Sequence, residues 1–468
     1  MALEKTNIII LGAGMGSRMK SKLPKVLHKV AGKTLMDHLL SSIEKIEIPV
    51  NVLSVLSQDI LDNFSAQLPK SRYRNYVVQE KRLGTGHATM CAVEDKNFCT
   101  TYKYTGIFYA DVPFVEPETI QKLYKLQERY DLVVLCFEAA DQSQKYGRMY
   151  IKGNHIKVGE FRRLKEIREF IDIEGEKPTL CNSGIMFGKT EIFMKLLSKI
   201  QNKNKAKEYY LTDIIALANK AKYRVATLRC EESEMLGINS QEELANAEMV
   251  YQKKLKKKFF NNGVSFIMPD TIYLSHDTEI GIGTTIEPHV FLGTGVKIGE
   301  NCHIRAGSYL EDTTLKGGSD FGPMSRGRGG AVIGEDVHIG NFAEIKNSTV
   351  GKGTKIGHVS YTGDTTLGEN VNIGAGMIIC NYDGVKKYHT DIGNNAFIGS
   401  NTTIVSPCKI EDNTFVAGGS TITKHVKEYD LAVGRAKQEN IEGWVKKRRT
   451  IVKEQQTEDN KQKKKRKN

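Results

Sequence analysis

The second half of the chain repeats an aliphatic residue at every sixth position, and this repeat limits the possible folds more than any other feature. It is seen at Ile280, Ile286, Leu292, Ile298, Ile304 and Leu310, at Ile333, Ile339 and Ile345, at Leu367, Ile373 and Ile379, and at Ile392, Ile398, Ile404 and Ile410. A glycine or a small polar residue often flanks the aliphatic one, as in "KIGE" and "NIGAG". Such a period predicts three short strands per coil, with each aliphatic side chain inside a triangular prism. We therefore expect a left-handed parallel β-helix of hexapeptide repeats over residues 256–445.

The repeat is interrupted around residues 316–330 and again at "NYDGVKKYHT", where we expect loops to leave the coil. Inserted loops on a solenoid commonly build its binding face. A purely structural stalk is the alternative, but a stalk has no use for chemically active side chains on its turns. This half carries such residues at Lys346, His358, Tyr361, Asn372, Asn381 and Tyr382.

The first half follows a different pattern, in which short apolar runs such as "NIIILG" and "YTGIFYAD" alternate with helical spacing. This alternation is typical of an α/β fold with a mainly parallel sheet, whose ligands lie beyond the carboxyl ends of the strands. Gly14 and Asp111 both fall at such ends. The later segment "SQEELANAEMVYQKKLKKKFF" has apolar residues at helical spacing and a lysine-rich face. We expect an α/β domain over residues 1–230 and a linker helix over residues 231–255.

The loop "LGAGMGSRMKSKLPK" follows the first predicted strand and departs from two known phosphate-binding patterns. Ser17 stands where a dinucleotide fingerprint needs its last small residue, and no Gly-Lys-Ser/Thr closes a P-loop. Glycines still let backbone N–H groups approach an anion, and Arg18 and Lys25 add two cations. The loop by itself is compatible with a polyphosphate site and with an ordinary strand-to-helix turn.

Charge and cysteine content exclude several classes of protein. Residues 446–468 hold eleven Lys or Arg against three Asp or Glu, and so carry +8 of the net charge of +13. We expect a disordered, solubilising tail there, with anchoring to RNA or anionic lipid as the alternative. No aromatic-rich basic groove accompanies this charge, so a nucleic-acid partner is not expected.

No run approaches the roughly 20 apolar residues of a membrane span, and no signal peptide precedes the first strand, so we expect a cytoplasmic protein. The eight cysteines include no C-x-x-C pair, which indicates neither a zinc site nor a disulfide framework.

Short motifs follow one another in a fixed order along both halves. The first half has "LGAGMGSRM", "QEKRLGTGHA", "YADVP", "YGR", "IREFID", "CNSGI" and "LGINSQEEL"; the second has "SRGRGG", "NFAEIKNS", "KIGHVSYTGD", "NIGAGMIICNYDG", "IGSNT" and "AVGRAKQ". In this order they resemble one family, the bacterial bifunctional N-acetylglucosamine-1-phosphate uridyltransferases and glucosamine-1-phosphate acetyltransferases. The resemblance covers roughly Asn7 to Trp444.

The resemblance implies a nucleotidyltransferase (Rossmann-like) site in the first half that binds UTP and a sugar phosphate. Its implied residues are Leu11, Ala13, Gly14, Gln79, Gly84 and Thr85 around the base, Arg18 and Lys25 at the phosphates, and Gly147, Glu169 and Asn182 at the sugar. Asp111 and Asn239 would hold Mg²⁺, which commonly takes few protein oxygens besides phosphates and waters.

In the second half the resemblance implies an acetyltransferase site, which in this family lies between the chains of a homotrimer. Arg328, Lys346, Tyr361 and Asn372 would bind glucosamine-1-phosphate, and Ala375, Asn381, Tyr382, Ser400, Gly418 and Arg435 would bind acetyl-CoA. The 2-amino group of the sugar must lose a proton to attack the thioester, and we choose His358 as the general base because a histidine pKa suits this task near neutral pH. We expect Glu344 to orient its imidazole, the backbone around Tyr382 to stabilise the oxyanion, and His28 and His87 to be packing residues.

Four positions depart from the family pattern. Gly12 stands where alanine is usual, and Ala110 replaces the glycine before the metal aspartate. Ile171 replaces a lysine, which we expect to alter sugar affinity, and Gly329 replaces a proline, which we expect to loosen the Arg328 loop. A regulatory protein that keeps both folds without turnover is the competing interpretation. The presence of Arg18, Asp111 and His358 favours the bifunctional enzyme, which would make UDP-N-acetylglucosamine.

Overall fold

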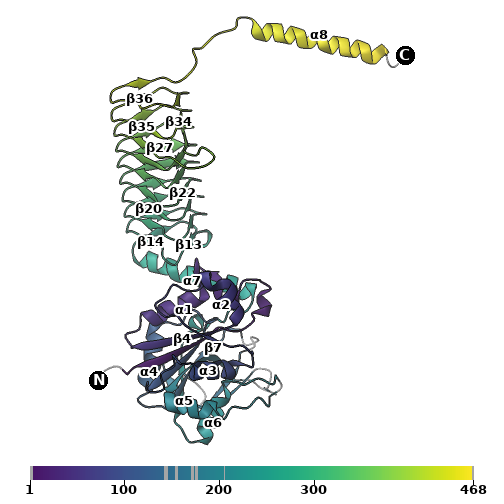
Figure 1. Cartoon of the computed structure of the whole chain (residues 1–468), viewed down its shortest axis with the longest axis vertical. Coiled ribbons are helices and arrows are strands. Elements are labelled where there is room, and N and C mark those ends of the chain that lie inside the picture. Colours follow the sequence, from purple (N-terminus) through teal and green to yellow (C-terminus); the bar gives the residue numbers. More distant parts are fainter. Residues whose placement is uncertain are drawn as a thin grey trace. The chain divides into compact units, whose positions relative to one another are not determined.

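The computed structural model describes residues 4–141, 146–152, 156–169, 173, 178–204 and 206–465. The chain divides into two compact units, Met1–Lys297 and Ile298–Asn468. The first holds an α/β domain and the second consists mostly of stacked parallel strands (Figure 1). The first unit extends beyond the α/β domain expected over residues 1–230, because it includes the linker helix and the first strands that follow it.

A nine-stranded sheet forms the centre of the α/β domain, in the order β5-β4-β1-β6-β10-β7-β11-β9-β8. Its strands are β1 (Thr6–Leu11), β4 (Val50–Leu56), β5 (Asn75–Val78), β6 (Tyr104–Tyr109), β7 (Leu132–Glu138), β8 (Arg148–Ile151), β9 (Phe161–Arg168), β10 (Leu180–Lys189) and β11 (Val225–Arg229). β1 pairs in parallel with β4 and β6, as expected. β10 runs antiparallel to β6 and β7, so the sheet is mixed.

Helices cover both faces of this sheet. They are α1 (Leu35–Glu44), α2 (Gln58–Phe64), α3 (Thr85–Glu94), α4 (Pro117–Leu126), α5 (Thr190–Leu197) and α6 (Asp213–Lys220). Successive side chains of a strand point to opposite faces, and accordingly Ile8 and Ile10 belong to one buried cluster while Ile9 and Leu11 belong to another. The continuous apolar run of β1 is therefore explained by burial on both sides.

The linker helix is α7 (Gln241–Asn261), which begins later and ends later than the range 231–255. Ser240 caps its start, because the Ser240 side chain accepts a hydrogen bond from the Glu243 N–H at 3.1 Å. Within the first unit, the Gln252 side chain donates to the Leu274 carbonyl at 2.7 Å and accepts from the Leu274 N–H at 3.0 Å. These bonds join α7 to β13 (Tyr273–Leu274). The other first strands of the repeat region are β12 (Ser265–Phe266), β14 (Glu279–Ile280), β15 (Thr285–Ile286) and β16 (Phe291–Leu292).

The second unit contains three parallel sheets, as a β-helix with three strands per coil requires. Sheet one holds β18 (His303–Ile304), β21 (Asp320–Phe321), β24 (His338–Asn341), β27 (Lys355–His358), β30 (Asn372–Ile373), β33 (Phe397–Ile398), β36 (Phe415–Val416) and β38 (Leu431–Ala432). Sheet two holds β19 (Tyr309–Leu310), β22 (Arg326–Arg328), β25 (Glu344–Lys346), β28 (Tyr361–Gly363), β31 (Ile378–Cys380), β34 (Thr403–Val405) and β37 (Thr421–Ile422). Sheet three holds β20 (Thr313–Leu315), β23 (Ala331–Ile333), β26 (Thr349–Val350), β29 (Thr365–Leu367), β32 (Thr390–Ile392) and β35 (Cys408–Ile410).

One of the two expected interruptions is wrong. Residues 316–330 do not leave the coil, since β21 and β22 lie there and pair with the strands on either side. Phe321 is completely buried, and a Cβ added at Gly327 would lie 3.5 Å from its ring. A large aromatic beside a glycine fills the interior where two aliphatic residues stand elsewhere, so the repeat disappears from the sequence while the coil continues.

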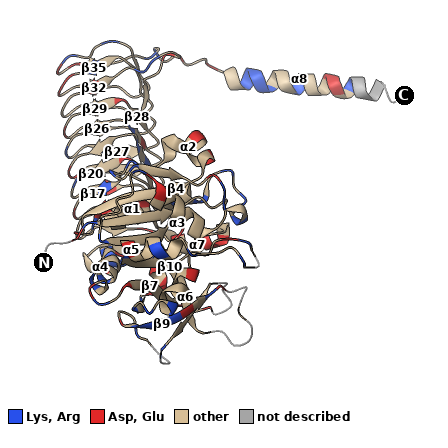
Figure 2. Cartoon of the chain, turned by 60° about the horizontal axis from the view of Figure 1, so that its bottom comes forward, with Lys and Arg blue, Asp and Glu red and all other residues tan. Residues whose placement is uncertain are grey.

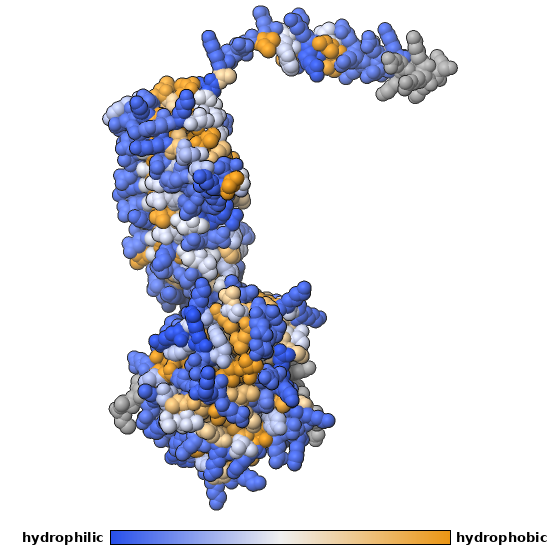
Figure 3. All heavy atoms as spheres, viewed as in Figure 1, coloured by the Kyte–Doolittle hydropathy of each residue, from blue (hydrophilic) through white to orange (hydrophobic). Residues whose placement is uncertain are grey.

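The basic tail also differs from its prediction, because α8 (Trp444–Lys465) spans most of it (Figure 2). Every residue of 444–461 is exposed, so intrinsic propensity rather than packing accounts for this helix. Lys, Arg, Gln and Glu are all good helix formers. Its surface is largely hydrophilic with a few apolar side chains, among them Trp444 and Ile451 (Figure 3). Within the described residues, no helix is long and apolar enough to cross a membrane.

Candidate active sites

A hollow of about 440 Å³ lies at the carboxyl ends of β1 and β6, where the sequence predicts the nucleotide site. The predicted residues that line it are Leu11, Ala13, Gly14, Lys25, Gln79, Gly84, Thr85 and Asp111. The remaining predicted residues of this half, Arg18, Gly147, Glu169, Asn182 and Asn239, are not part of this lining. Arg18 is exposed on the short helix η1 (Ser17–Met19).

The segment predicted to bind the base is held in place by contacts of Gln79 and Gly84. Gln79 is buried, and its amide donates to the Gly84 carbonyl at 3.2 Å. Gly84 has φ +103°, and a Cβ there would lie 2.7 Å from the Tyr209 carbonyl oxygen, so only glycine fits. The Gln79 amide nitrogen also lies 3.1 Å from Nδ1 of His87. His87 is therefore a polar partner of the segment and not only the packing residue that we expected.

Three side chains from distant segments converge on one point near Asp111. The Lys25 ammonium lies 2.5 Å from Asp111 Oδ2 and 3.0 Å from Asn239 Oδ1. The Ile238 N–H donates to the Asp111 carbonyl at 2.9 Å, which fixes the segment before α7 against the end of β6. Both side-chain oxygens thus surround a single positive charge. A carboxylate and an amide oxygen directed at one cation match the ligand chemistry of Mg²⁺.

The predicted sugar residues form a second group beside this point. The Asn182 N–H donates to the Gly147 carbonyl at 2.7 Å, and the Thr212 hydroxyl donates to Glu169 at 2.9 Å. A Cβ at Gly147 would lie 3.5 Å from Glu169 Oε2 and 3.6 Å from Asn182 Cβ, so a larger residue would fill the space between them. Ile171 lies outside the described residues.

Tyr109 connects the two groups, and the sequence reasoning missed it. Burial raises the pKa of its phenol, and the carboxylates of Glu169 and Asp111 raise this pKa further. Its hydroxyl therefore remains a neutral hydrogen-bond donor in this acidic environment. Arg82 was also missed: it lines the hollow and its Nε donates to the Ala13 carbonyl at 3.0 Å.

The departures at Gly12 and Ala110 explain each other. Ala110 is completely buried, and a Cβ added at Gly12 would lie 3.4 Å from its methyl group and 3.0 Å from a Leu56 methyl group. The Ala110 methyl occupies space beside the one that an alanine at position 12 would need. The exchanged pair keeps the same two small residues in the opposite order.

In the second unit, some of the predicted acetyltransferase residues lie in one column along the coil. Ile339 pairs with Ile356, Ile356 with Ile373, Ile373 with Ile398 and Ile398 with Val416. The residues two positions further along form the corner column, which consists of Asn341, His358, Ala375, Ser400 and Gly418. Four of these were predicted. Above His358 the column contains only small side chains, which leaves room along the corner for an extended ligand.

Arg435 ends this column, because its Nη1 donates to the Gly418 carbonyl at 2.7 Å. Asn372, by contrast, lies in register with Lys355 and Phe397, three positions before the corner column.

The predicted phosphate-binding residues lie on sheet two. Arg328 pairs with Lys346 and Lys346 with Gly363, while Glu344 pairs with Tyr361. The expectation that Glu344 orients the histidine is wrong. Its carboxylate accepts a hydrogen bond from Arg328 Nε at 2.6 Å, and the partner of His358 is Asn341, whose Oδ1 lies 2.5 Å from Nδ1 of the imidazole. Glu344 lies on sheet two, in register with Arg326, whereas Asn341 lies on sheet one, in register with His358 on the next coil.

The second expected loop, "NYDGVKKYHT", does leave the coil between β31 and β32. A bridge between Tyr382 and Lys387 closes it, and the Tyr388 N–H donates to the Asn381 carbonyl at 2.8 Å. The loop returns Lys387 to the side chain of Lys346, and this neighbouring ammonium lowers the pKa of Lys387. Two lysines held together indicate an anion site, and Lys387 was missed because its partner lies on another coil.

Asp364 is a further residue of this site that the sequence did not indicate. Its carboxylate accepts hydrogen bonds from the side-chain amides of Asn381 and Asn347, the latter at 2.5 Å. Its negative charge also attracts the Lys387 ammonium. Gly329 has φ +63°, a conformation that the fixed φ of proline excludes. The Arg328 loop is therefore built differently from the proline form of the family pattern.

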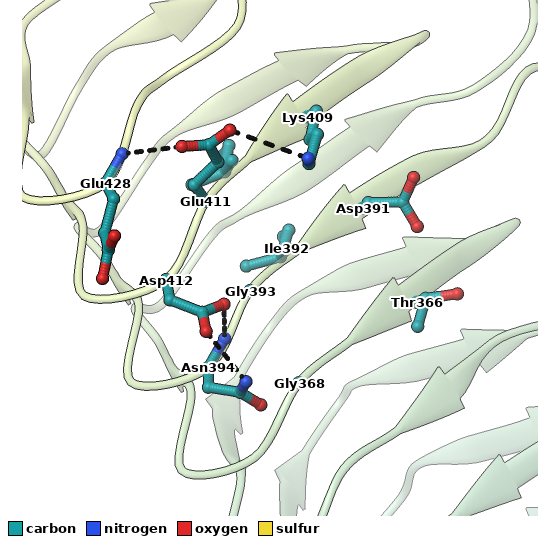
Figure 4. A pocket seen from close by; sticks show the side chains of 11 residues that line it. Thr366, Gly368, Asp391, Ile392, Gly393, Asn394, Lys409, Glu411, Asp412 and Glu428 are labelled. Atoms are coloured by element: carbon teal, nitrogen blue, oxygen red, sulfur yellow. Dashed lines mark hydrogen bonds and ion pairs between the residues drawn. The ribbon is translucent and has the colours of Figure 1, made fainter.

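A separate hollow on sheet three is lined mainly by acidic side chains, in contrast to the lysines at the predicted phosphate site (Figure 4). Asp391, Glu411, Asp412 and Glu428 line it, with Lys409 as a partner of Glu411 at 3.6 Å. Its carboxylates repel phosphates, so it does not suit the anionic substrates expected for this chain. Among the described residues, no group of three or more His, Cys, Asp or Glu side chains is arranged to hold a metal ion, and the cysteines form no disulfide.

Comparisons with known proteins agree with this division. A MobA-like NTP transferase domain model matches residues 8–177, and a model of the bacterial transferase hexapeptide (six repeats) matches residues 277–312 and 389–424. The bifunctional protein GlmU of Paramagnetospirillum magneticum is 39% identical over 455 residues, which are 95% of this chain and 97% of that protein. GlmU of Ruegeria sp. is 39% identical over 446 residues, and GlmU of Clostridium botulinum strain ATCC 19397 is 37% identical over 465 residues. These alignments cover 94% and 95% of this chain and 96% and 99% of the two relatives.

The predicted fold class and the resemblance are thereby confirmed: a nucleotidyltransferase domain precedes hexapeptide repeats, and the relatives extend over almost the whole chain. The chain belongs to the GlmU family of bifunctional enzymes.

Proposed function

We propose that the chain makes UDP-N-acetylglucosamine in two transfers at two separate sites. Acetyl transfer from acetyl-CoA to glucosamine-1-phosphate gives N-acetylglucosamine-1-phosphate, which then attacks UTP and releases pyrophosphate. The observation that supports this proposal most is that one chain contains both a hollow lined by Lys25 and Asp111, at the predicted nucleotide site, and a corner column that runs from His358 to Arg435. Each set of residues suits one of the two reactions.

For uridyl transfer, the sugar phosphate oxygen attacks the α-phosphorus of UTP in line with the leaving pyrophosphate. This chemistry depends on positioning and on neutralising charge rather than on a covalent enzyme intermediate. Lys25 binds the phosphates, Gln79 and Thr85 hold the base, and Arg18, which is exposed on η1, would contact the outgoing phosphates. Glu169 and Asn182 orient the sugar, and Tyr109 stays protonated to donate a hydrogen bond between the two groups.

Asp111 and Asn239 would hold Mg²⁺ at this site, in agreement with the convergence of their oxygens on the Lys25 ammonium. When bound, this ion would neutralise phosphate charge that two protein cations balance only in part. Without a cation beside it, the Asp111 carboxylate would repel the substrate phosphates.

For acetyl transfer, the amine nitrogen of glucosamine-1-phosphate attacks the thioester carbonyl while Nε2 of His358 takes its proton. The thiolate of CoA then leaves and receives a proton. Arg328, Lys346 and Lys387 bind the sugar phosphate, and Tyr361 and Asn372 bind the sugar. Backbone N–H groups near Tyr382 stabilise the oxyanion. Asn381, held by Asp364, lies at the start of the loop that borders this site.

The corner column supports the placement of acetyl-CoA along the coil. Stacked strands are about 4.8 Å apart, so the rise from His358 through Ala375, Ser400 and Gly418 to Arg435 spans roughly 19 Å in four steps. A long, thin acyl carrier with its thioester at one end and phosphates at the other fits this distribution of side chains. Arg435 would take a phosphate, and the small residues would line the path of the acyl arm.

The homotrimer is part of this proposal. Beside the corner column, Met324, Phe342 and Val359 occupy successive turns in the left-handed conformation and are each more than half exposed in the single chain. Bulky and β-branched residues are unusual in this conformation, and apolar side chains in a row on a surface commonly mark an interface. A second chain packed here would cover them and enclose His358. Light scattering of the purified protein tests whether three chains associate.

The function is tested by incubating the purified chain with glucosamine-1-phosphate, acetyl-CoA, UTP and Mg²⁺ and following products by mass spectrometry. We expect N-acetylglucosamine-1-phosphate first and UDP-N-acetylglucosamine later. Formation of UDP-N-acetylglucosamine without prior N-acetylglucosamine-1-phosphate, or no formation of UDP-N-acetylglucosamine at all, would contradict the proposal.

A further inference from the structure

His358 and Asn341 occupy the same corner on neighbouring coils, and the backbone beneath them forces them together. Gly340 and Gly357 precede the two residues, and a Cβ added at Gly340 would lie only 1.8 Å from the Gly357 carbonyl oxygen. The coils approach so closely here that only glycine fits at position 340. The resulting register places Asn341 Oδ1 at 2.5 Å from Nδ1 of His358.

The backbone of His358 is fixed as well. Its carbonyl accepts a hydrogen bond from the Ser360 hydroxyl at 2.8 Å and another from the Gly376 N–H at 3.3 Å. The Val359 N–H donates to the Asn341 carbonyl at 3.0 Å. The histidine side chain itself is exposed, and its hydrogen bond with Asn341 determines how the ring is turned.

An amide oxygen only accepts hydrogen bonds, so the imidazole nitrogen facing it carries the proton. In the neutral ring this leaves the lone pair on Nε2, the nitrogen directed away from Asn341. We propose that Asn341 is a positioning residue that holds His358 in the Nδ1–H tautomer, so that Nε2 can accept the proton of the substrate amine. This inference rests on the proposed acetyl transfer.

The chemistry of the partner matters as much as its position. A carboxylate in the place of Asn341 would favour the imidazolium and raise the pKa of His358. A neutral amide orients the ring without this charge effect. A general base must carry a free lone pair to take the proton of an attacking amine, and the Nδ1–H tautomer leaves that lone pair on Nε2.

The charged neighbours on the strands beside His358 are few. β24 contributes His338, whose Nδ1 lies 3.1 Å from Asp320, and β27 itself contributes Lys355. β30 contributes Asn372 and no titratable group, and β28 contributes Tyr361. His338 and Lys355 pair with each other three positions before the corner. A charge introduced at position 341 would therefore act on the His358 imidazole from within hydrogen-bond distance.

Two substitutions separate orientation from simple structural support. In Asn341→Ala the ring loses its acceptor, and we expect kcat for acetyl transfer to fall between about 10- and 10³-fold, as losses of orienting partners do, with little change in KM. In Asn341→Asp the acceptor remains, and we expect kcat at high pH to recover most of the loss. The part of its pH profile in which acetyl transfer rises with pH should shift to higher pH, because the added charge raises the pKa of His358. Asn394→Ala, which removes an amide that bonds Asp412 on a distant part of the coil, serves as the control and should leave acetyl transfer unchanged.

A second readout does not depend on turnover. In protein labelled with ¹⁵N-histidine, the His358 signal should report Nδ1–H in the wild type and a mixture of tautomers in Asn341→Ala. Wild-type acetyl transfer with an unchanged tautomer in Asn341→Ala would overturn the inference, and so would identical pH profiles for the two variants. If the wild type shows the Nδ1–H tautomer but transfers no acetyl group, the proposed function fails while the pairing stands.

Discussion

Replacing Gly340 with alanine tests whether close coil packing sets the geometry of the acetyltransferase site. The new Cβ would have to move from 1.8 Å to at least 3.0 Å from the Gly357 carbonyl oxygen, and this oxygen belongs to rigid backbone. Overpacking of this kind costs up to about 3 kcal/mol. Loss of the neighbouring bond from the Val359 N–H to the Asn341 carbonyl adds about 1 kcal/mol. We therefore expect a loss of about 4 kcal/mol in the stability of the β-helix.

The matched control is Gly357→Ala, one coil further on, where an added Cβ meets nothing within 4 Å. For a unit of this size, 4 kcal/mol corresponds to a fall in Tm of about 10 °C. Circular dichroism melting would measure it, with acetyl transfer and uridyl transfer assayed in parallel. We expect Gly340→Ala to melt early and to lose acetyl transfer while keeping uridyl transfer, and Gly357→Ala to resemble the wild type in melting. Equal melting of the two variants would refute the reasoning.

Three further predictions concern the rest of the chain. Burial lowers the pKa of His38 to about 4, so the unfolded chain takes up the proton first as the pH falls below about 6.5; stability should fall by about 2 kcal/mol between pH 7 and pH 5. Urea unfolding followed by loss of uridyl transfer would show this slope, and His38→Asn should flatten it. Removing the chain after Thr450 should leave both activities nearly intact, since residues 451–461 are all exposed; a large fall in kcat would assign the tail a further role. Gly12→Ala should lower Tm, and Ala110→Gly in the same chain should recover part of the loss, whereas additive effects would show that the two positions do not share space.

Much of the fold could be predicted because its pattern is local. The six-residue period is carried by side chains that fill the prism one by one, and the first strands are continuous apolar runs. The coil around Phe321 and Gly327 was not predicted because neither residue is aliphatic. The large Phe321 side chain fills the space that Gly327 on the next strand leaves open, and a search for one aliphatic residue in every six does not detect this. The prediction of a disordered tail was wrong for a different reason, because residues of high helix propensity can form a helix without an apolar pattern.

The candidate sites were predicted chiefly through motifs whose order along the chain could be read directly. What motifs do not contain is the partner one coil away. Asn341 lies 17 residues before His358 and Lys387 reaches Lys346 through a loop, so neither contact follows from spacing within a motif. One signal was available, because "HIGN" and "KIGH" place both residues directly after an inward isoleucine and a glycine. Tyr109 gave no such signal, since it lies at the end of an apolar strand.

The central claim, that one chain performs two transfers at separate sites, is tested most directly by complementation between His358→Ala and Asp111→Ala. Supplied with glucosamine-1-phosphate, acetyl-CoA, UTP and Mg²⁺, the first variant should stop before acetylation but convert added N-acetylglucosamine-1-phosphate, and the second should accumulate N-acetylglucosamine-1-phosphate. Loss of the base should reduce acetyl transfer by roughly 10² to 10⁴ fold. A mixture of the two folded variants should again produce UDP-N-acetylglucosamine, because the intermediate passes through solution. Undiminished synthesis by either variant alone, or no synthesis by the mixture, would contradict the account.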